Sequence, residues 1–455
     1  MNRGSMTVSR ILMCRNHPVL EFEYFPYAGY ALGCREIYDK RRVPLGMYVD
    51  GKPEPSGESI TRWWRGRGIP ITRDGLSAVL GASGMPSTTE MLDRSLGLSL
   101  SDQYWVRPAE MDDLQWDTIN FFHNDFDERL GSALFFGNSS KIVDVNTPDV
   151  TSAGDLPKRW VIGADGTRKL IKAGRTGQEP DNERIAFLTA GLFGISHLEY
   201  KIGHTRGVRV SVCDEMLSDR EELVPGGQIM NIFRQGGPKE RKDIWIEACT
   251  RLGAGKEEIT RATDDSLFLD FLLRNTDRHY SNFGLIRDVE TFEIRPAPLF
   301  DSGANLWNGM DPDCIDNSDY PSKPFWIDDY GDANCAYWQL SLISEWDRFD
   351  LSLLDQVPDM VKDQLSGNRR IPADVVDSIA TTLKERGSII RKAREKTAGG
   401  LSAGIGAMPL RQAATAKSCL HTESQSNGGE VVLEDPDPAQ ITMSLKSIST
   451  GPSLS

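Results

Sequence analysis

Hydrophobic and polar positions alternate near the start of the chain and change to a helical spacing further along. The segment 19–25, Val-Leu-Glu-Phe-Glu-Tyr-Phe, alternates as a half-buried strand does, whereas 76–81 and 88–96 have the spacing of short helices. Aromatic residues are frequent throughout this first block, residues 1–130, and such residues are typical of a core or an interface between domains. The block contains no group of residues with an evident catalytic chemistry.

The second block, residues 131–235, has the pattern of strands joined by turns and interrupted by one helix. Strands are predicted at 160–163 and 169–173. A helix is predicted to begin near residue 180, because Ile185, Leu188 and Leu192 form an apolar stripe. A further strand at 208–216 ends in polar residues, which favours a crossover to the next part of the chain.

The third block, residues 236–395, is predicted to be mainly helical. Its apolar segment 266–273 leads directly into a polar loop, which is followed by a short strand at 283–286. The last block, residues 396–455, is rich in Gly, Ser, Thr and Ala. Such a composition cannot bury enough apolar surface to offset the entropy of ordering, so we expect this tail to be disordered.

Composition narrows the class of protein. The 455 residues, of which 39% are hydrophobic, suggest roughly two to four globular domains. With 52 basic and 66 acidic residues, the chain is a poor candidate for direct nucleic-acid binding. Seven scattered cysteines without a CxxC pair favour a reducing compartment. We find no signal peptide and no apolar run of about 18 residues, so we expect a cytoplasmic protein without membrane contact.

The polar loop after the apolar helix has the spacing of a phosphotransfer site. Asp277 and Asn282 stand five residues apart, and Asp301 follows at the end of the next apolar approach, before Ser-Gly. Phosphoryl transfer needs a carboxylate that orients the attacking hydroxyl, and oxygen ligands for the metal that neutralises the phosphates. We therefore predict Asp277 as the base and Asn282 and Asp301 as Mg²⁺ ligands. His279 is expected to brace the loop by hydrogen bonding.

Residues upstream could hold the phosphates of a nucleotide. The turn at 151–160, with Ser152 and Gly154, consists of small residues that let backbone N–H groups approach phosphates, although it also has the composition of an ordinary hairpin turn. Lys172 follows Leu-Ile at a strand end, where a kinase lysine reaches the α- and β-phosphates. Glu183 is predicted to pair with this lysine or to stabilise the start of its helix.

The predicted strand at 208–216, which contains Asp214, would lead into a linker between two lobes, whose backbone could bind adenine. Together with the turn, the lysine and the polar loop, this order of elements resembles the HipA-like kinases, a family related to protein kinases and phosphatidylinositol kinases. The most specific matching motif is Asn-Thr-Asp-Arg-His-Tyr-Ser-Asn at 275–282, followed by Asp-Ser-Gly at 301–303. The resemblance covers residues 131–395, over half of the chain.

The resemblance implies an α+β, two-lobed protein-kinase-like fold. Residues 1–130 would form an N-terminal accessory subdomain, 131–235 a β-rich N-lobe and 236–395 a helical C-lobe. It implies an ATP- and Mg²⁺-dependent Ser/Thr protein kinase with a protein substrate, and autophosphorylation at Thr151 or Ser152. Some family members are toxins held by a DNA-binding antitoxin, so an antitoxin-like protein partner is a further implication.

Three other interpretations fit part of the pattern. A lipid or small-molecule kinase also uses Asp-x-His-x-x-Asn followed by Asp-x-Gly, but we find no basic cluster that would face a membrane. A kinase fold that only binds a partner would be expected to lack a phosphotransfer residue, and Lys172, Asp277, Asn282 and Asp301 are all present. A transition-metal enzyme is disfavoured because His279 is the only histidine in the cluster.

Overall fold

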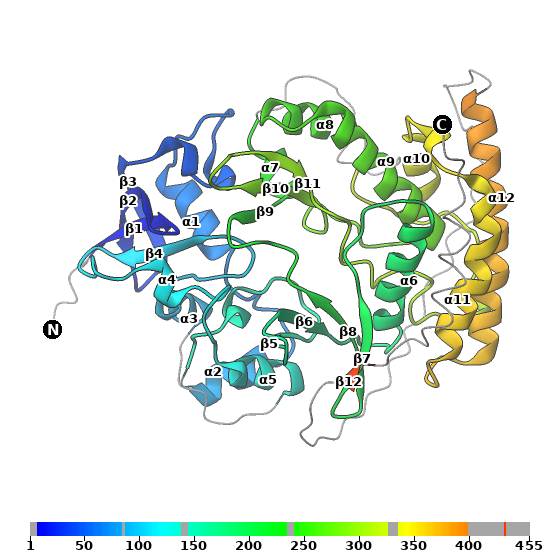
Figure 1. Ribbon diagram of the computed structural model, residues 1–455, viewed down its shortest axis with the longest axis horizontal. Helices are drawn as coiled ribbons and strands as arrows, with labels where there is room; N and C mark the ends of the chain where they lie inside the picture. The colour runs from blue at the N-terminus through cyan, green and yellow to red at the C-terminus, as the bar shows by residue number, and fades with distance from the viewer. Residues whose placement is uncertain are drawn as a thin grey trace, which may run out of the picture.

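Helices and antiparallel β-sheets make up a mixed α/β structure (Figure 1). The computed structural model describes residues 7–83, 87–137, 144–233, 241–325, 335–398 and 432–433. Within these residues the strands form a four-stranded, a five-stranded and a three-stranded sheet. No helix in the described ranges is long and apolar enough to cross a membrane. The six cysteines that lie in them are free thiols.

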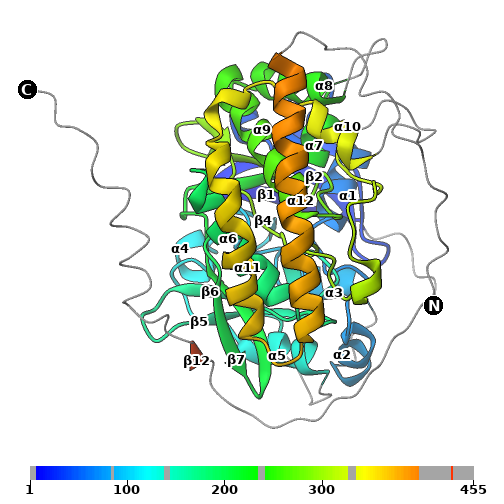
Figure 2. The same cartoon turned by 90° about the vertical axis from the view of Figure 1, so that its right-hand side faces the viewer.

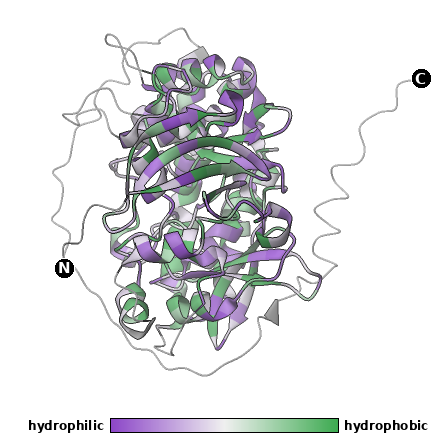
Figure 3. Ribbon diagram, turned by 90° about the vertical axis from the view of Figure 1, so that its left-hand side faces the viewer, coloured by the Kyte–Doolittle hydropathy of each residue, from purple (hydrophilic) through white to green (hydrophobic). Residues whose placement is uncertain are grey.

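The four-stranded sheet is built by the first block and has the order β3-β2-β1-β4. The strand predicted at 19–25 lies within β2, where Leu20, Phe22 and Tyr24 are buried and the residues between them are more exposed. Figure 3 faces this side of the molecule and shows hydrophobic and hydrophilic residues alternating along the strands. The bounds of these elements are β1 Val8–Cys14, β2 His17–Phe25, β3 Tyr30–Ile37, β4 Tyr104–Pro108, α1 Gly57–Arg65, α2 Leu76–Ser83, α3 Thr88–Arg94, α4 Trp116–Ile119 and α5 Glu128–Phe136.

The five-stranded sheet has the order β12-β7-β8-β6-β5 and carries the candidate nucleotide residues. Ile171 of β6 and Val212 of β8 lie opposite each other and pack with Phe135 of α5 on one face. The alternation of a strand then places Lys172 on the other face. The strands and the helix predicted in this block are confirmed, with the bounds β5 Lys158–Ile162, β6 Arg168–Lys172, α6 Glu179–Leu192, β7 Lys201–Thr205, β8 Val208–Asp214 and β12 Val432–Leu433.

The three-stranded sheet, in the order β11-β10-β9, contacts helices α7 and α9, which lie between β9 and β10 in the chain. The largest hydrophobic cluster gathers residues from α6, α8, α9, α11 and α12, among them Phe268 stacked on Phe349. Helices α11 and α12 lie side by side on one flank of the molecule (Figure 2). The bounds are β9 Glu221–Pro225, α7 Gly226–Met230, α8 Arg241–Arg251, α9 Lys256–Leu273, β10 Gly284–Asp288, β11 Ile294–Pro296, α10 Ala336–Ser341, α11 Val357–Ser366 and α12 Ala373–Ala398.

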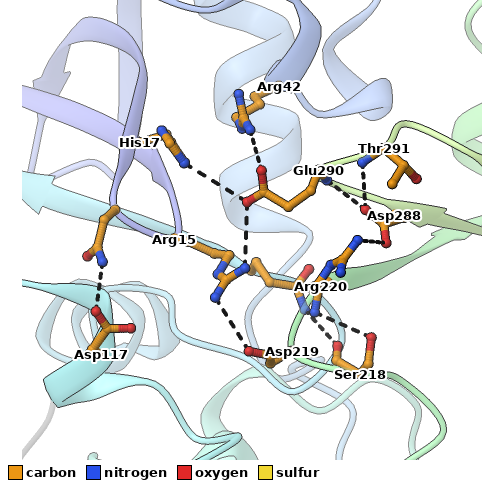
Figure 4. A network of polar contacts seen from close by, with 12 residues as sticks. Arg15, His17, Arg42, Asp117, Ser218, Asp219, Arg220, Asp288, Glu290 and Thr291 are labelled. Carbon is orange, nitrogen blue, oxygen red and sulfur yellow. Dashed lines mark hydrogen bonds and ion pairs between the residues drawn. The ribbon is translucent and has the colours of Figure 1, made fainter.

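The first block packs closely on the rest of the chain. Met13 and Trp105 of its sheet share one hydrophobic cluster with Leu217 and with Ile286 of β10. At the rim of this interface Glu290 accepts from Arg42 at 2.6 Å and lies 3.6 Å from Arg15, as Figure 4 shows. Arg15 also reaches Asp219 at 3.5 Å (Figure 4). Apolar packing and a polar rim therefore join the N-terminal sheet to the three-stranded sheet.

The domain boundaries expected from the sequence differ in how they relate to the observed helices and strands. The boundary at residue 130 falls inside α5, which packs against β5. The boundary at 235 lies in residues 234–240, outside the described residues. Helix α12 continues to Ala398, slightly past the expected start of the tail. Of that tail, the described residues include a further strand, β12, which pairs with β7, whereas the disorder expected at 399–431 and 434–455 concerns residues that are not described.

Candidate active site

Lys172 lies at the centre of the candidate site and connects two of the predicted acidic residues. Its Nζ donates to Asp301 Oδ1 at 2.9 Å, to Glu183 Oε1 at 3.2 Å and to the Tyr200 hydroxyl at 3.2 Å. The lysine comes from β6 and Glu183 from α6, so a strand and a helix meet here. Glu183 also accepts a hydrogen bond from the backbone N–H of Ser302 at 2.9 Å. The ion pair expected between Lys172 and Glu183 is present.

The charges in this group stabilise one another in a buried setting. Burial disfavours the charged form of Lys172, but Asp301 and Glu183 outweigh it and hold the pKa of the lysine well above its ordinary value. Burial also opposes ionisation of Asp301, yet Lys172 and then Lys158 hold the pKa of that carboxyl well below its ordinary range. For Glu183, burial prevails over the attraction of Lys172 and raises the pKa. Asp301 is therefore an ionised carboxylate surrounded by cations.

The loop with Asp277 begins where α9 ends. Arg274 takes a left-handed conformation, with φ 56°, and closes the helix. Within the loop, Asn282 Nδ2 donates to the backbone carbonyl of Asp277 at 2.8 Å, so the amide oxygen of Asn282 is the atom that could bind a metal. His279 Nδ1 accepts from the Ser281 N–H at 3.2 Å, as expected for a residue that braces the loop.

Arg278 ties this loop to the segment that carries Asp301. Its guanidinium is buried and binds both carboxylate oxygens of Asp270, at 2.9 and 3.0 Å. It also donates to the carbonyls of Asn282 at 2.7 Å and Phe300 at 2.6 Å. The guanidinium thus holds both Asn282, the candidate metal ligand of the loop, and Phe300, the residue before Asp301. Arg278 was not among the predicted site residues.

The turn after the short 3-10 helix Pro148–Thr151 holds the candidate phosphate-binding residues. Gly154 has φ 83°, a conformation that favours glycine. The two hydroxyls expected as phosphorylation sites are buried and bonded: Thr151 Oγ1 donates to Leu98 O at 2.9 Å, and Ser152 Oγ donates to Asp149 O at 3.1 Å. Phosphorylation of either hydroxyl therefore requires this turn to move.

Lys158 is a second cation at the site, and it was not predicted from the sequence. It lies directly opposite Lys172 on the neighbouring strand β5, and both side chains are buried. A Cβ on Gly154 would come within 2.7 Å of Lys158 Nζ, so the turn covers this ammonium. Burial lowers the pKa of Lys158 to about 8, against the opposing influence of Asp301. The strands expected at 160–163 and 169–173 are close enough in the sequence to form a hairpin. Pairing them as a hairpin could have predicted that the two lysines lie opposite each other.

Lys323 is a further residue that the sequence did not indicate. Its Nζ lies 3.5 Å from Asp277 Oδ1, and both side chains are half exposed. It reaches the loop from 46 residues further along the chain, and no motif marks it. A cation beside the predicted base can also approach a phosphate that faces this carboxylate.

The side chain of Asp214 lies away from the other candidates. It forms an ion pair with Lys169 at 2.7 Å, and these two residues are directly opposite on β8 and β6. Lys172 and Asp214 belong to opposite faces of the sheet, because Asp214 shares the face of Val212. A contribution of Asp214 to adenine binding through its backbone stays a prediction.

The oxygen donors fit Mg²⁺ better than a transition metal. Among the described residues, no three His, Cys, Asp or Glu side chains gather as a metal-binding group. The candidate ligands are the amide oxygen of Asn282 and the ionised carboxylate of Asp301. Mg²⁺ is commonly held by one or two carboxylates together with substrate phosphates and water, so this small donor set fits a metal that arrives with a nucleotide.

Comparisons with known proteins give only distant likenesses. No family model and no curated protein matches the chain. The Helicobacter pylori proinflammatory kinase CtkA is similar over 55% of this chain and 93% of its own, with 18% identity and a TM-score of 0.44. A chain of the Shewanella oneidensis MR-1 complex of HipA, HipB and operator DNA covers 85% of this chain and 99% of its own, with 14% identity and a TM-score of 0.49. The Golgi casein kinase covers 70% and 89%, with 12% identity and a TM-score of 0.32. Similarities this low carry no argument about activity.

Proposed function

We propose that this protein is an ATP- and Mg²⁺-dependent, HipA-like Ser/Thr protein kinase with the two-lobed arrangement of kinases, capable of phosphorylating itself. The observation that carries the proposal is the contact of Lys172 with both Glu183 and Asp301, at 3.2 and 2.9 Å. A kinase needs such a lysine for the phosphates and such an aspartate for the metal.

Each residue has a role that follows from its chemistry. Bound ATP with Mg²⁺ would supply the phosphoryl group and the metal charge that offsets the phosphates. Asn282 and Asp301 would hold the metal through their oxygens, and Lys172 and Lys158 would hold the phosphates. Asp277 would orient the acceptor hydroxyl and take its proton as the hydroxyl oxygen bonds to phosphorus and ADP leaves. Lys323 lies close enough to Asp277 to stabilise charge on the transferred group.

The present contacts of Lys172 imply a rearrangement when a nucleotide binds. An ammonium has three N–H donors, and here Glu183, Tyr200 and Asp301 account for all of them. A phosphate oxygen can replace only one of these partners. Asp301 is the partner that would leave, because a bound metal would compete for its carboxylate. Glu183 and Tyr200 would keep the lysine in place.

The direct test is transfer of label from γ-labelled ATP with Mg²⁺ to the protein itself and to a generic protein acceptor. We expect transfer by the wild type and a loss of at least about 100-fold in Asp277→Ala, because the base is removed. ATP binding should be largely unchanged in that variant. Asp113→Ala, which removes an exposed carboxylate between β4 and α4, is the matched control and should stay active.

The other outcomes separate the competing functions. Equal transfer by Asp277→Ala and the wild type would contradict the assignment of the base. Binding of ATP without transfer to any protein would favour a lipid or small-molecule acceptor, or a fold that only binds a partner. Acid hydrolysis of the labelled protein, followed by identification of the phosphoamino acid, tests the Ser/Thr specificity.

A further inference from the structure

The turn that covers Lys158 is held from outside by three consecutive residues of the N-terminal part. Arg73 donates from Nε to Gly154 O at 2.6 Å, and from Nη2 to Ser152 O at 2.6 Å and Ala153 O at 3.0 Å. Its guanidinium therefore engages three successive carbonyls of the turn. Arg73 itself is buried, with 3% of its surface exposed. Arg73 lies in the connection between α1 and α2, about 80 residues before the turn.

The neighbours of Arg73 extend this contact on both sides. Thr72 Oγ1 donates to Asp155 Oδ1 at 2.6 Å, at the end of the turn. Asp74 lies 3.3 Å from Arg175, in the connection from β6 to α6 that follows Lys172. Thr72, Arg73 and Asp74 thus join the turn over Lys158 to the segment just after Lys172. We call these three residues the 72–74 clamp.

The carbonyl contacts determine where the amides of the turn point. In a planar trans peptide the N–H points opposite to the preceding carbonyl. Since the carbonyls of residues 152–154 point toward Arg73, the N–H groups of residues 153–155 point away from it. None of these three N–H groups donates to an acceptor within the described part of the chain. Successive amides with free hydrogens, next to the ammonium of Lys158, make an anion-binding concavity.

We propose that the 72–74 clamp holds the 152–155 turn in the conformation that presents its amides to the phosphates of a nucleotide. Arg73 is a positioning residue: it acts through the turn and does not touch the nucleotide. The inference rests on the proposed function, because it takes the phosphates of ATP as the anion. It assigns the N-terminal part a role in nucleotide affinity.

The experiment compares the binding of ATP–Mg²⁺ and of adenosine to the full chain by calorimetry. For Arg73→Lys we expect about tenfold weaker ATP binding, because one ammonium cannot engage three carbonyls and the turn loses its fixed shape. Adenosine lacks phosphates, so its affinity should not change. Arg67→Lys is the matched control, since Arg67 is also a buried arginine of the N-terminal part but binds Asp102 and the carbonyls of Gly97 and Tyr104. This control should bind both ligands like the wild type.

A second variant tests the clamp without replacing a buried residue. Thr72 and Asp74 are exposed, so the double variant Thr72→Val, Asp74→Asn should fold normally and still weaken ATP binding about threefold. Unchanged ATP affinity in Arg73→Lys, or an equal loss for ATP and adenosine, would overturn the clamp while leaving the proposed function intact. Failure of the wild type to bind ATP would overturn both.

Discussion

Two lysines directly opposite each other on paired strands are an unfavourable arrangement unless an anion lies between or beside them. Lys172 has two carboxylate partners, whereas Lys158 makes no hydrogen bond or ion pair within the described residues. The strand therefore carries a buried cation whose charge lowers the stability of the protein without ligand. A phosphate would offset this charge, which agrees with the proposed binding of a nucleotide.

Lys158→Met should stabilise the protein without ligand and weaken its binding of ATP. At pH 7 the lysine is charged although its pKa is lowered from 10.5 to about 8, a cost on the order of 3 kcal/mol. We expect the free energy of unfolding of the variant to be higher by up to this amount, so that it unfolds at a higher urea concentration. Its ATP affinity should fall about tenfold, because a charge-assisted hydrogen bond to phosphate is lost. Calorimetry and urea denaturation measure the two effects.

The pH dependence of stability gives a second check on Lys158. Between pH 8 and 10.5 the unfolded chain binds more protons at this lysine than the folded chain does, so the free energy of unfolding rises with pH across that window. Lys158→Met should lack this part of the rise. The free energy of unfolding is measured at pH 7.5 and at pH 10 for both proteins. An equal change between these pH values in the variant and the wild type would contradict the lowered pKa of Lys158.

Asp301→Asn should abolish the Mg²⁺ dependence of nucleotide binding. The amide keeps the shape of the carboxylate but lacks the charge that a hard cation requires. The variant also leaves Lys172 and Lys158 facing a neutral group, so we expect it to be less stable than the wild type. ATP titrations with and without Mg²⁺ measure the first effect. Binding that still strengthens on addition of Mg²⁺ would exclude Asp301 as a ligand.

At the scale of elements, periodicity predicted which segments form helices and strands, but not how their ends meet. The apolar segment 266–273 was expected to be a helix and lies within α9, and the strand expected at 283–286 overlaps β10. Alternation and helical spacing are local properties, so one sequence is enough to detect them. Arg278 lies in the same motif, yet its binding of Asp270 and Phe300 depends on tertiary contacts that no local spacing encodes.

Arg278→Lys should destabilise the protein strongly. A lysine cannot hold both oxygens of Asp270 and two carbonyls at once, so a buried carboxylate and backbone groups lose partners. We expect a loss of about 3–5 kcal/mol in the free energy of unfolding, measured by urea denaturation. The control is Arg295→Lys, which alters an exposed pair with Glu221 at 2.9 Å and should change stability by less than about 1 kcal/mol. Similar losses in both variants would show that the loop is not fixed by Arg278.

At the scale of the whole molecule, the candidate site draws on segments that lie far apart in the sequence. Lys172, Asp277 and Asp301 were found because each lies in a motif whose order and spacing are visible in one sequence. Arg73 and Lys323 were not found, because each reaches the site from a distant segment with no motif of its own. The first block was expected to be an accessory subdomain without catalytic chemistry. Its contacts with the 152–155 turn indicate that its packing matters for the site.

The interface that joins the first block to the three-stranded sheet contains a buried ion pair with a predictable energetic role. Arg287 of β10 pairs with Glu222 of β9 and donates to the Tyr104 hydroxyl of β4 at 2.7 Å. Glu222→Gln would leave Arg287 buried without a charged partner, so we expect a loss of about 3–5 kcal/mol in stability. Glu290→Gln, in the partly buried rim shown in Figure 4, should cost less, about 1 kcal/mol.

Replacing both members of the buried pair should separate its electrostatic role from its packing role. Glu222→Met with Arg287→Met removes both charges together, so the double variant should be more stable than Glu222→Gln alone. The 72–74 clamp could depend on the packing of the first block against the three-stranded sheet. In that case Glu222→Gln should also weaken ATP binding, and the double variant should restore part of that affinity. Loss of stability in Glu222→Gln without any change in ATP affinity would show that the clamp works independently of this interface.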